Sequence, residues 1–194
     1  MARSFPSFVS RSATKDLLMI GLISQLMGCI YVDRSTTKTH QGVAGLVKDR
    51  IVKTARGAAP GERPMLLFPE GTTTNGNFLL PFRKGAFLAG APVQPVILRY
   101  PVNRVSPAWE TISGLRHIWL MLCNPVHSVI FYELPVYHPT KAEASNPELY
   151  ANNVRQYMLR NSHGLEASES SLAEKQILHA HLRGEEPPVS KKRE

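Results

Sequence analysis

Apolar residues along the chain follow two spacings. Short apolar or β-branched runs, which predict strands, alternate with stretches whose apolar residues recur every three or four positions, which predict helices. The predicted strands cover residues 5–9, 29–32, 65–68, 94–100 and 126–134. The predicted helices cover residues 17–26, 42–56, 83–90, 117–123, 145–160 and 168–182. This alternation favours an α/β domain with a mixed, mainly parallel sheet flanked by helices, in which a right-handed crossover joins strands 65–68 and 94–100.

Three apolar segments predict burial. Residues 65–68 form an uninterrupted apolar run, which is typical of a buried strand, and the helix over residues 17–26 is apolar almost all round. The run from His117 to Cys123 fits either the core or an apolar surface for lipid or acyl chains, and the core is the default interpretation. The most apolar window, residues 17–32, is interrupted by Ser24 and Gln25 and is shorter than the roughly 20 residues that span a bilayer, so no transmembrane helix is expected.

Length and charge narrow the classes of function. The 194 residues suit one domain over residues 1–162, followed over residues 163–194 by a helix and a disordered basic tail. The net charge is +8, and the excess lies in residues 1–140, which hold 15 Lys and Arg against 7 Asp and Glu. A basic face attracts anionic lipid, phosphorylated cofactors or nucleic acid. No zinc-finger spacing, basic helix or basic and aromatic interleaving is present, so nucleic acid is not an expected partner.

The two cysteines indicate the compartment. Cys29 and Cys123 both lie in apolar runs, without a CxxC spacing or nearby histidine clusters. We therefore expect two buried free thiols in a reducing compartment. The N-terminus lacks the layout of a secretory signal peptide.

The candidate chemistry gathers in one loop, Phe68–Gly76, directly after the apolar run 65–68. The loop holds one carboxylate, two glycines and three consecutive threonines. Hydroxyls and free backbone N–H groups of this density can bind a phosphate or another polar head group. An ordinary strand-exit turn at Asn75-Gly76 is the alternative.

Two basic residues are further candidates for phosphate binding. Arg34 follows the predicted strand 29–32, where a guanidinium could hold a phosphate in a bidentate manner, although a solvated arginine or an Asp33 pair explains it equally well. Lys84 lies at the start of the predicted helix 83–90, where a cation opposes the helix dipole and so indicates an anion nearby.

Three motifs in this order and spacing resemble motifs two, three and four of the PlsC-type glycerophospholipid acyltransferases, and most closely those of the lysophosphatidylcholine and lysophosphatidylethanolamine acyltransferases. They are Gly28–Arg34, Phe68–Gly76 and Val93–Ile97, and the similarity runs from about Phe5 to about Arg160. The resemblance implies a single PlsC-like domain that transfers a fatty acyl group from acyl-CoA to a lysophospholipid. It also implies an enzyme of phospholipid biosynthesis in peripheral contact with the cytosolic face of the endoplasmic reticulum membrane, without a metal or further cofactor.

The resemblance also assigns roles to residues. Arg34 would hold the acceptor phosphate, and Glu70, Gly71 and Thr72 would order the acceptor pocket. Since two anions repel, Glu70 would contact a substrate hydroxyl or hold Arg34, while the amides of Gly71 and Thr72 face the phosphate. Lys84 would be a further phosphate ligand.

The general base of this family, the histidine of an H-x-x-x-x-D motif, has no counterpart here. None of the seven histidines is followed five positions later by aspartate. The catalytic residues are therefore expected to lie outside this chain, in an enzyme of which it is an N-terminally incomplete version. The alternative is a catalytically inactive lipid- or CoA-binding module.

Overall fold

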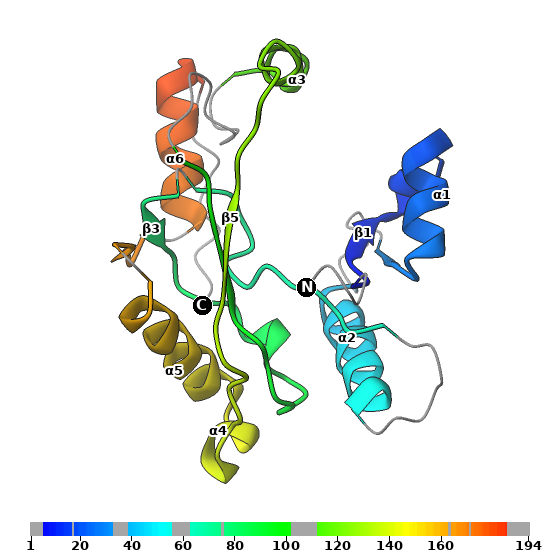
Figure 1. Ribbon diagram of the computed structural model, residues 1–194, viewed down its shortest axis with the longest axis vertical. Helices are drawn as coiled ribbons and strands as arrows, with labels where there is room; N and C mark the ends of the chain where they lie inside the picture. The colour runs from blue at the N-terminus through cyan, green and yellow to red at the C-terminus, as the bar shows by residue number, and fades with distance from the viewer. Residues whose placement is uncertain are drawn as a thin grey trace. The chain divides into compact units, whose positions relative to one another are not determined.

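The computed structural model describes residues 6–16, 18–32, 39–55, 63–74, 76–101, 112–162, 164–170 and 172–185. Figure 1 shows its helices and strands in chain order. The chain forms two compact units. Unit 1 comprises residues 1–69, 83–92 and 138–151, and unit 2 comprises residues 70–82, 93–137 and 152–194.

Unit 1 combines two short strands with helices that come from three separate stretches of the chain. Its elements are β1 (Val9–Arg11), the 3-10 helix η1 (Ser12–Asp16), α1 (Leu18–Leu26), β2 (Ile30–Val32), α2 (Thr39–Ala55), the 3-10 helix η2 (Lys84–Ala86), α4 (Lys141–Ser145) and the first residues of α5 (Pro147–Arg160). β1 and β2 pair in parallel, with Val9 opposite Ile30. An isolated parallel bridge joins Ser7 to Met65, so the chain before the candidate loop lies beside the N-terminal segment.

Caps and one aromatic pair fix the C-terminal part of unit 1. Thr140 and Glu143 form a reciprocal capping box at the start of α4. The side chain of Asn146 accepts hydrogen bonds from the N–H groups of Glu148 and Leu149, with Pro147 in the first turn of α5. Tyr150 is fully buried, contacts Phe87 edge to face and donates its hydroxyl to Ala91 O.

Unit 2 contains two small sheets and two complete helices. β3 (Phe78–Leu79) pairs in parallel with β6 (Glu166–Ala167), and β4 (Val96–Arg99) pairs in antiparallel fashion with β5 (Ile130–Glu133). The helices are α3 (Gly114–Leu122) and α6 (Leu172–Arg183), and most of α5 belongs to this unit. The buried apolar residues of unit 2 are Leu79, Leu80, Ile97, Val154, Met158 and Ala180.

The α/β class is confirmed, with differences in detail. Two of the three two-stranded sheets are parallel, as the mainly parallel expectation requires. The expected crossover between strands 65–68 and 94–100 is wrong, because β4 pairs instead with β5. Residues 65–68 form only the single bridge at Met65, and Phe68 is 64% exposed, so this run is extended but is not a buried strand. The expected helix over residues 83–90 is limited to the one turn of η2.

Burial differs from expectation at both apolar helices. The large apolar side chains of α1 are between 51% and 91% exposed, and no residue of α3 is buried. Both thiols are free, as expected. Neither is buried as expected, because Cys29 is half-buried and Cys123 is exposed. Apolar periodicity identifies an apolar face without identifying what covers it. None of the helices in the described ranges has the length and hydropathy to cross a bilayer.

Several expectations fall on residues outside the described ranges. They are the role of Arg34, the turn position of Asn75 and the disorder of the tail over residues 187–194. The domain boundary between residues 162 and 163 also stays a prediction.

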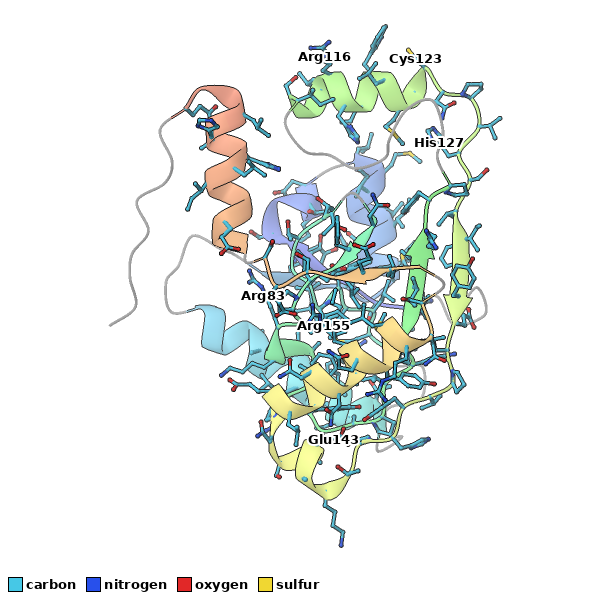
Figure 2. The ribbon with its side chains drawn as sticks, turned by 90° about the vertical axis from the view of Figure 1, so that its left-hand side faces the viewer. Arg83, Arg116, Cys123, His127, Glu143 and Arg155 are labelled. Carbon is cyan, nitrogen blue, oxygen red and sulfur yellow. The ribbon has the colours of Figure 1, made fainter. Side chains whose placement is uncertain are left out.

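Arg155 connects α5 to the strands of unit 2 (Figure 2). The residue is 4% exposed, and its Nη2 donates to Leu79 O at 3.0 Å and to Ser168 O at 2.8 Å. Its Nη1 donates to Glu169 Oε1 at 2.9 Å. A buried guanidinium needs acceptors, and those of its two terminal nitrogens come from β3 and from the segment after β6. Arg155 thus joins α5 to β3, which lies 76 residues earlier in the chain, and to the segment that follows β6.

We predict that Arg155→Met lowers the free energy of unfolding by roughly 1.5–3 kcal/mol, because it removes charge-assisted hydrogen bonds to buried carbonyl groups. Urea denaturation followed by circular dichroism measures the effect. Glu169→Gln is the control. Its carboxylate is 80% exposed, so its loss is expected to cost less than about 1 kcal/mol. Equal effects of the two substitutions would contradict a central role for the guanidinium.

Candidate functional site

The Glu70 carboxylate closes the candidate loop. Its Oε2 accepts a hydrogen bond from the backbone N–H of Leu80 at 3.0 Å, across ten residues of sequence. Leu80 is buried, and an amide buried without a partner is costly, so this bond fixes where the loop ends. The carboxylate therefore has a structural partner in unit 2. Its predicted contact with a substrate hydroxyl or with Arg34 stays a prediction.

Two glycines shape the loop between Glu70 and Leu80. Gly71 has a φ of 70° and Gly76 a φ of 82°, a left-handed conformation that residues with a side chain rarely adopt. Gly71 lies directly after the anchored Glu70 and is exposed. The chain consequently turns immediately after the carboxylate.

The threonines of the loop bond to neighbouring residues. The hydroxyl of Thr74 accepts from the N–H of Gly76 at 3.3 Å, and the hydroxyl of Thr72 is 3.5 Å from Thr73 O. Both contacts are long and exposed, which indicates weak bonds that water or a ligand oxygen can replace. Thr72 and Thr74 are half-buried, and Thr73 is exposed. The loop thus keeps hydroxyl groups at the surface, beside the anchored carboxylate.

One peptide group links this loop to Arg155. The N–H of the Leu79–Leu80 peptide donates to Glu70, and its C=O accepts from Arg155 Nη2 and from the N–H of Ser168. An anion at one end of a peptide dipole and a cation at the other polarise it in the same direction, so the two bonds strengthen each other. The position of Glu70 therefore depends on the core of unit 2.

The predicted site residues that the structure describes fall in both units. Glu70, Gly71 and Thr72 are consecutive in unit 2, whereas Lys84 belongs to unit 1. Lys84 Nζ lies 2.9 Å from Glu148 Oε1, in a pair whose side chains are 62% and 70% exposed. An exposed ion pair of this kind contributes about 0–1 kcal/mol, so an anionic ligand can replace Glu148 at little cost.

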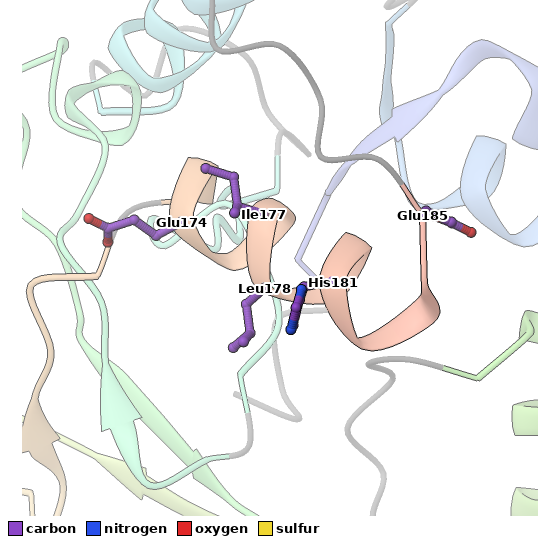
Figure 3. Close-up of a pocket in the computed structure, with 5 residues that line it drawn as sticks. All are labelled: Glu174, Ile177, Leu178, His181 and Glu185. Carbon is purple, nitrogen blue, oxygen red and sulfur yellow. The ribbon is translucent and has the colours of Figure 1, made fainter.

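A separate apolar hollow of about 350 Å³ lies along α6 (Figure 3). It is lined by Glu174, Ile177, Leu178, His181 and Glu185, and none of the predicted site residues is among them. A search of the described residues finds no cluster of histidine, cysteine and carboxylate side chains that could hold a metal ion.

Sequence reasoning missed Arg155 and the amide of Leu80 as parts of this arrangement. A signal for Arg155 is present, because it occupies the apolar face of α5 together with Ala151, Val154 and Met158. An arginine at the core-facing spacing of a helix indicates a buried hydrogen-bonded group. No comparable signal identifies Leu80, since every residue has a backbone amide.

Comparison with known families matches the segment that contains the loop. The acyltransferase family model covers residues 3–99, which include Arg34, Glu70, Gly71, Thr72 and Lys84. The α/β architecture and the glycine- and threonine-rich loop thus occur in a domain of this class. The chain belongs to the acyltransferase family.

The similar curated proteins are lysophospholipid acyltransferases. The chain is 48% identical over 186 residues to lysophospholipid acyltransferase LPEAT1 of Arabidopsis thaliana, with 95% of this chain and 46% of that protein covered. It is 37% identical to human lysophosphatidylcholine acyltransferase 1, over 78% of this chain and 28% of that protein. Human lysophospholipid acyltransferase LPCAT4 is 39% identical, over 84% and 30%. The chain therefore spans half or less of the length of these relatives, and no solved structure matches it.

We predict that Glu70→Ala lowers the free energy of unfolding by about 1–3 kcal/mol, because the buried Leu80 amide loses its acceptor. Glu70→Gln keeps a side-chain oxygen and should retain most of the stability. Urea denaturation of both variants measures the difference. If Glu70→Ala were as stable as the unsubstituted protein, the carboxylate would not be what closes the loop.

Proposed function

We propose that this chain is part of an enzyme that transfers a fatty acyl group from acyl-CoA to the free hydroxyl of a lysophospholipid, in phospholipid biosynthesis or remodelling. The observation that carries the proposal is the 48% identity to a lysophospholipid acyltransferase over 186 residues, a length that takes in nearly all of this chain. The family match over residues 3–99 supports the reaction class.

The geometry of the loop supports a role in binding the acceptor. The Glu70 side chain is held by the backbone N–H of Leu80. The backbone N–H of Gly71 and the hydroxyl of Thr72 belong to the two residues that directly follow Glu70, and Gly71 is exposed. We assign these two groups to the phosphate of the lysophospholipid, since backbone N–H and hydroxyl donors of a turn suit an anion. Arg34 and Lys84 stay predictions from the sequence resemblance, as cations that bind phosphate.

We assign Glu70, whose Oε2 accepts from the backbone N–H of Leu80, to ordering the acceptor pocket. A carboxylate held by a backbone amide is pre-organised for that role. Glu70 is not the general base in this proposal. That role belongs to the histidine of an H-x-x-x-x-D motif, which this chain does not contain.

A catalytically inactive lipid- or CoA-binding module is the second candidate function. It is favoured by one observation, the lack of any histidine followed five positions later by aspartate. Without general-base assistance the rate of transfer is expected to fall by about 10²- to 10⁴-fold. Binding of the two substrates would remain in that case.

We further propose that the protein works in peripheral contact with the cytosolic face of the endoplasmic reticulum membrane, with no metal or further cofactor. The basic excess in residues 1–140 supports contact with an anionic surface. The proposed acceptor, a lysophospholipid with a single acyl chain, is itself held in the membrane surface.

Transfer of labelled acyl-CoA to lysophosphatidylethanolamine and lysophosphatidylcholine tests the proposal. The chain is compared with a form extended upstream to the first H-x-x-x-x-D, and each is tested with Glu70→Gln. Transfer by the extended form, reduced at least tenfold by Glu70→Gln at unchanged stability, is the expected result. Saturable binding of acyl-CoA or lysophospholipid with no transfer by either form would support the binding module instead.

A matched glycine pair separates binding from stability in the loop. Gly71→Ala and Gly76→Ala each place a side chain at a positive φ, so each should lower the free energy of unfolding by about 1–2 kcal/mol. Only Gly71→Ala is expected to weaken lysophospholipid binding as well, because it displaces the amide that we assign to the phosphate. Equal dissociation constants for the two variants in equilibrium binding would contradict that assignment.

A further inference from the structure

The helix α3 turns its apolar stripe outward. Its four large exposed side chains are Leu115, Ile118, Trp119 and Leu122, which are between 57% and 84% exposed. Their spacing of i, i+3, i+4 and i+7 places them on one face of the helix. The half-buried residues His117, Leu120 and Met121 occupy the opposite face. In a soluble globular protein the apolar stripe of a helix normally faces the core, so this orientation is the reverse of the usual one.

No other described element covers this stripe. None of the residues of α3 is buried, and its contacts with the other described helices and strands are at most marginal. Its C-terminal end is fixed locally, because the His127 ring lies 2.9 Å from Met121 O. The helix is therefore ordered by its own turns and by the chain that follows, and its apolar face is open to a partner.

Charge favours a lipid surface as that partner. Between Glu110 and Glu133 the chain has no carboxylate, and Arg116 is the only lysine or arginine. Figure 2 shows Arg116 near the start of α3, with its side chain directed away from β5. A basic residue beside an apolar stripe can remain among anionic head groups while the stripe enters the acyl region. Trp119 supplies the amphipathic ring that is enriched at this boundary.

The size of the stripe also fits a membrane better than a protein. Four side chains are a small part of the roughly 20–30 residues that each partner contributes to a stable protein interface. A helix of nine residues is too short to cross a bilayer, which takes about 20. It is long enough to lie in the plane of the head groups with its apolar face inserted.

We infer that α3 is a membrane-docking helix, which inserts Leu115, Ile118, Trp119 and Leu122 into the interface of a bilayer rich in anionic phospholipid. This inference deepens the proposed function, because it names the surface by which the protein reaches an acceptor held in the membrane. It does not depend on catalysis, since the docking surface is defined by exposure and charge alone.

The test uses Trp119 as its own reporter. The sequence has two tryptophans, so Trp109→Phe leaves Trp119 as the only one. Vesicles of phosphatidylcholine with one fifth phosphatidylserine should shift its emission to shorter wavelengths, and brominated acyl chains in the same vesicles should quench it. Unchanged emission at saturating lipid would overturn the inference, whatever the rest of the protein binds.

Substitutions then measure the contribution of the stripe to vesicle partitioning. Leu122→Glu should lower the partition coefficient at least about tenfold, because it replaces an exposed leucine that inserts into the bilayer with a charge that anionic lipid repels. Leu182→Glu is the matched control, since Leu182 is an exposed leucine on α6, and it should change partitioning by less than about twofold. Arg116→Gln should lower partitioning to anionic vesicles about fivefold and leave neutral vesicles unaffected.

Each other outcome contradicts the inference. Equal losses for Leu122→Glu and Leu182→Glu would indicate non-specific adsorption. Self-association that Leu122→Glu abolishes, with no vesicle binding, would identify a second copy of the chain as the occupant. Circular dichroism checks that each variant is folded. If a variant is not folded, the emission of Trp119 in the Trp109→Phe protein decides whether α3 enters the bilayer.

The vesicle assay separates this inference from the proposed function. It needs neither acyl-CoA nor turnover, so a protein without transferase activity can still support α3 as the docking helix. Conversely, transfer by the upstream-extended form to a short-chain lysophospholipid kept below its micelle concentration reports on the reaction without a membrane.

Discussion

The peptide group between Leu79 and Leu80 is the point at which the candidate loop meets the core of unit 2. Both residues are buried, so both polar ends of this peptide need partners within the protein. β3 has only two residues, and it pairs with β6. The N–H of Ser168, directly after β6, is one partner of the Leu79 carbonyl. Glu70 and Arg155 supply the others, one an anion at the amide and the other a cation at the carbonyl.

This arrangement gives the carboxylate of the candidate loop a structural role. The bond from the Leu80 amide gives the Glu70 carboxylate a structural partner and fixes the start of the turn at Gly71. The donors of Gly71 and Thr72 are then positioned by the core through Arg155, and the proposed acceptor site does not depend on loop residues alone.

Sequence patterns predict the helices better than they predict the burial of those helices or the pairing of the strands. The spacing of apolar residues predicts the helices α1, α2, α5 and α6, because this spacing depends on local sequence. Burial was predicted poorly at α1 and α3, since an apolar stripe looks the same whether protein or lipid covers it. Strand pairing was also missed, because the partner of β4 lies some thirty residues later in the chain.

The candidate loop was recognisable from its composition and order, and so was its family. The contacts that hold it were not, because the partner of Glu70 is a backbone amide ten residues away and the partner of that peptide's carbonyl is a side chain on α5. Such contacts depend on tertiary packing. Arg155 at a core-facing position was the one clue that the sequence contained.

The central claim is that Glu70 and Arg155 act on the same peptide group and therefore stabilise the fold cooperatively. A double-mutant cycle of Glu70→Ala and Arg155→Met, measured as free energies of unfolding in urea, tests it most directly. The account predicts a coupling energy of at least about 0.5 kcal/mol, with the double variant less destabilised than the sum of the two single variants. Additivity within about 0.3 kcal/mol would contradict it, since independent residues show no coupling.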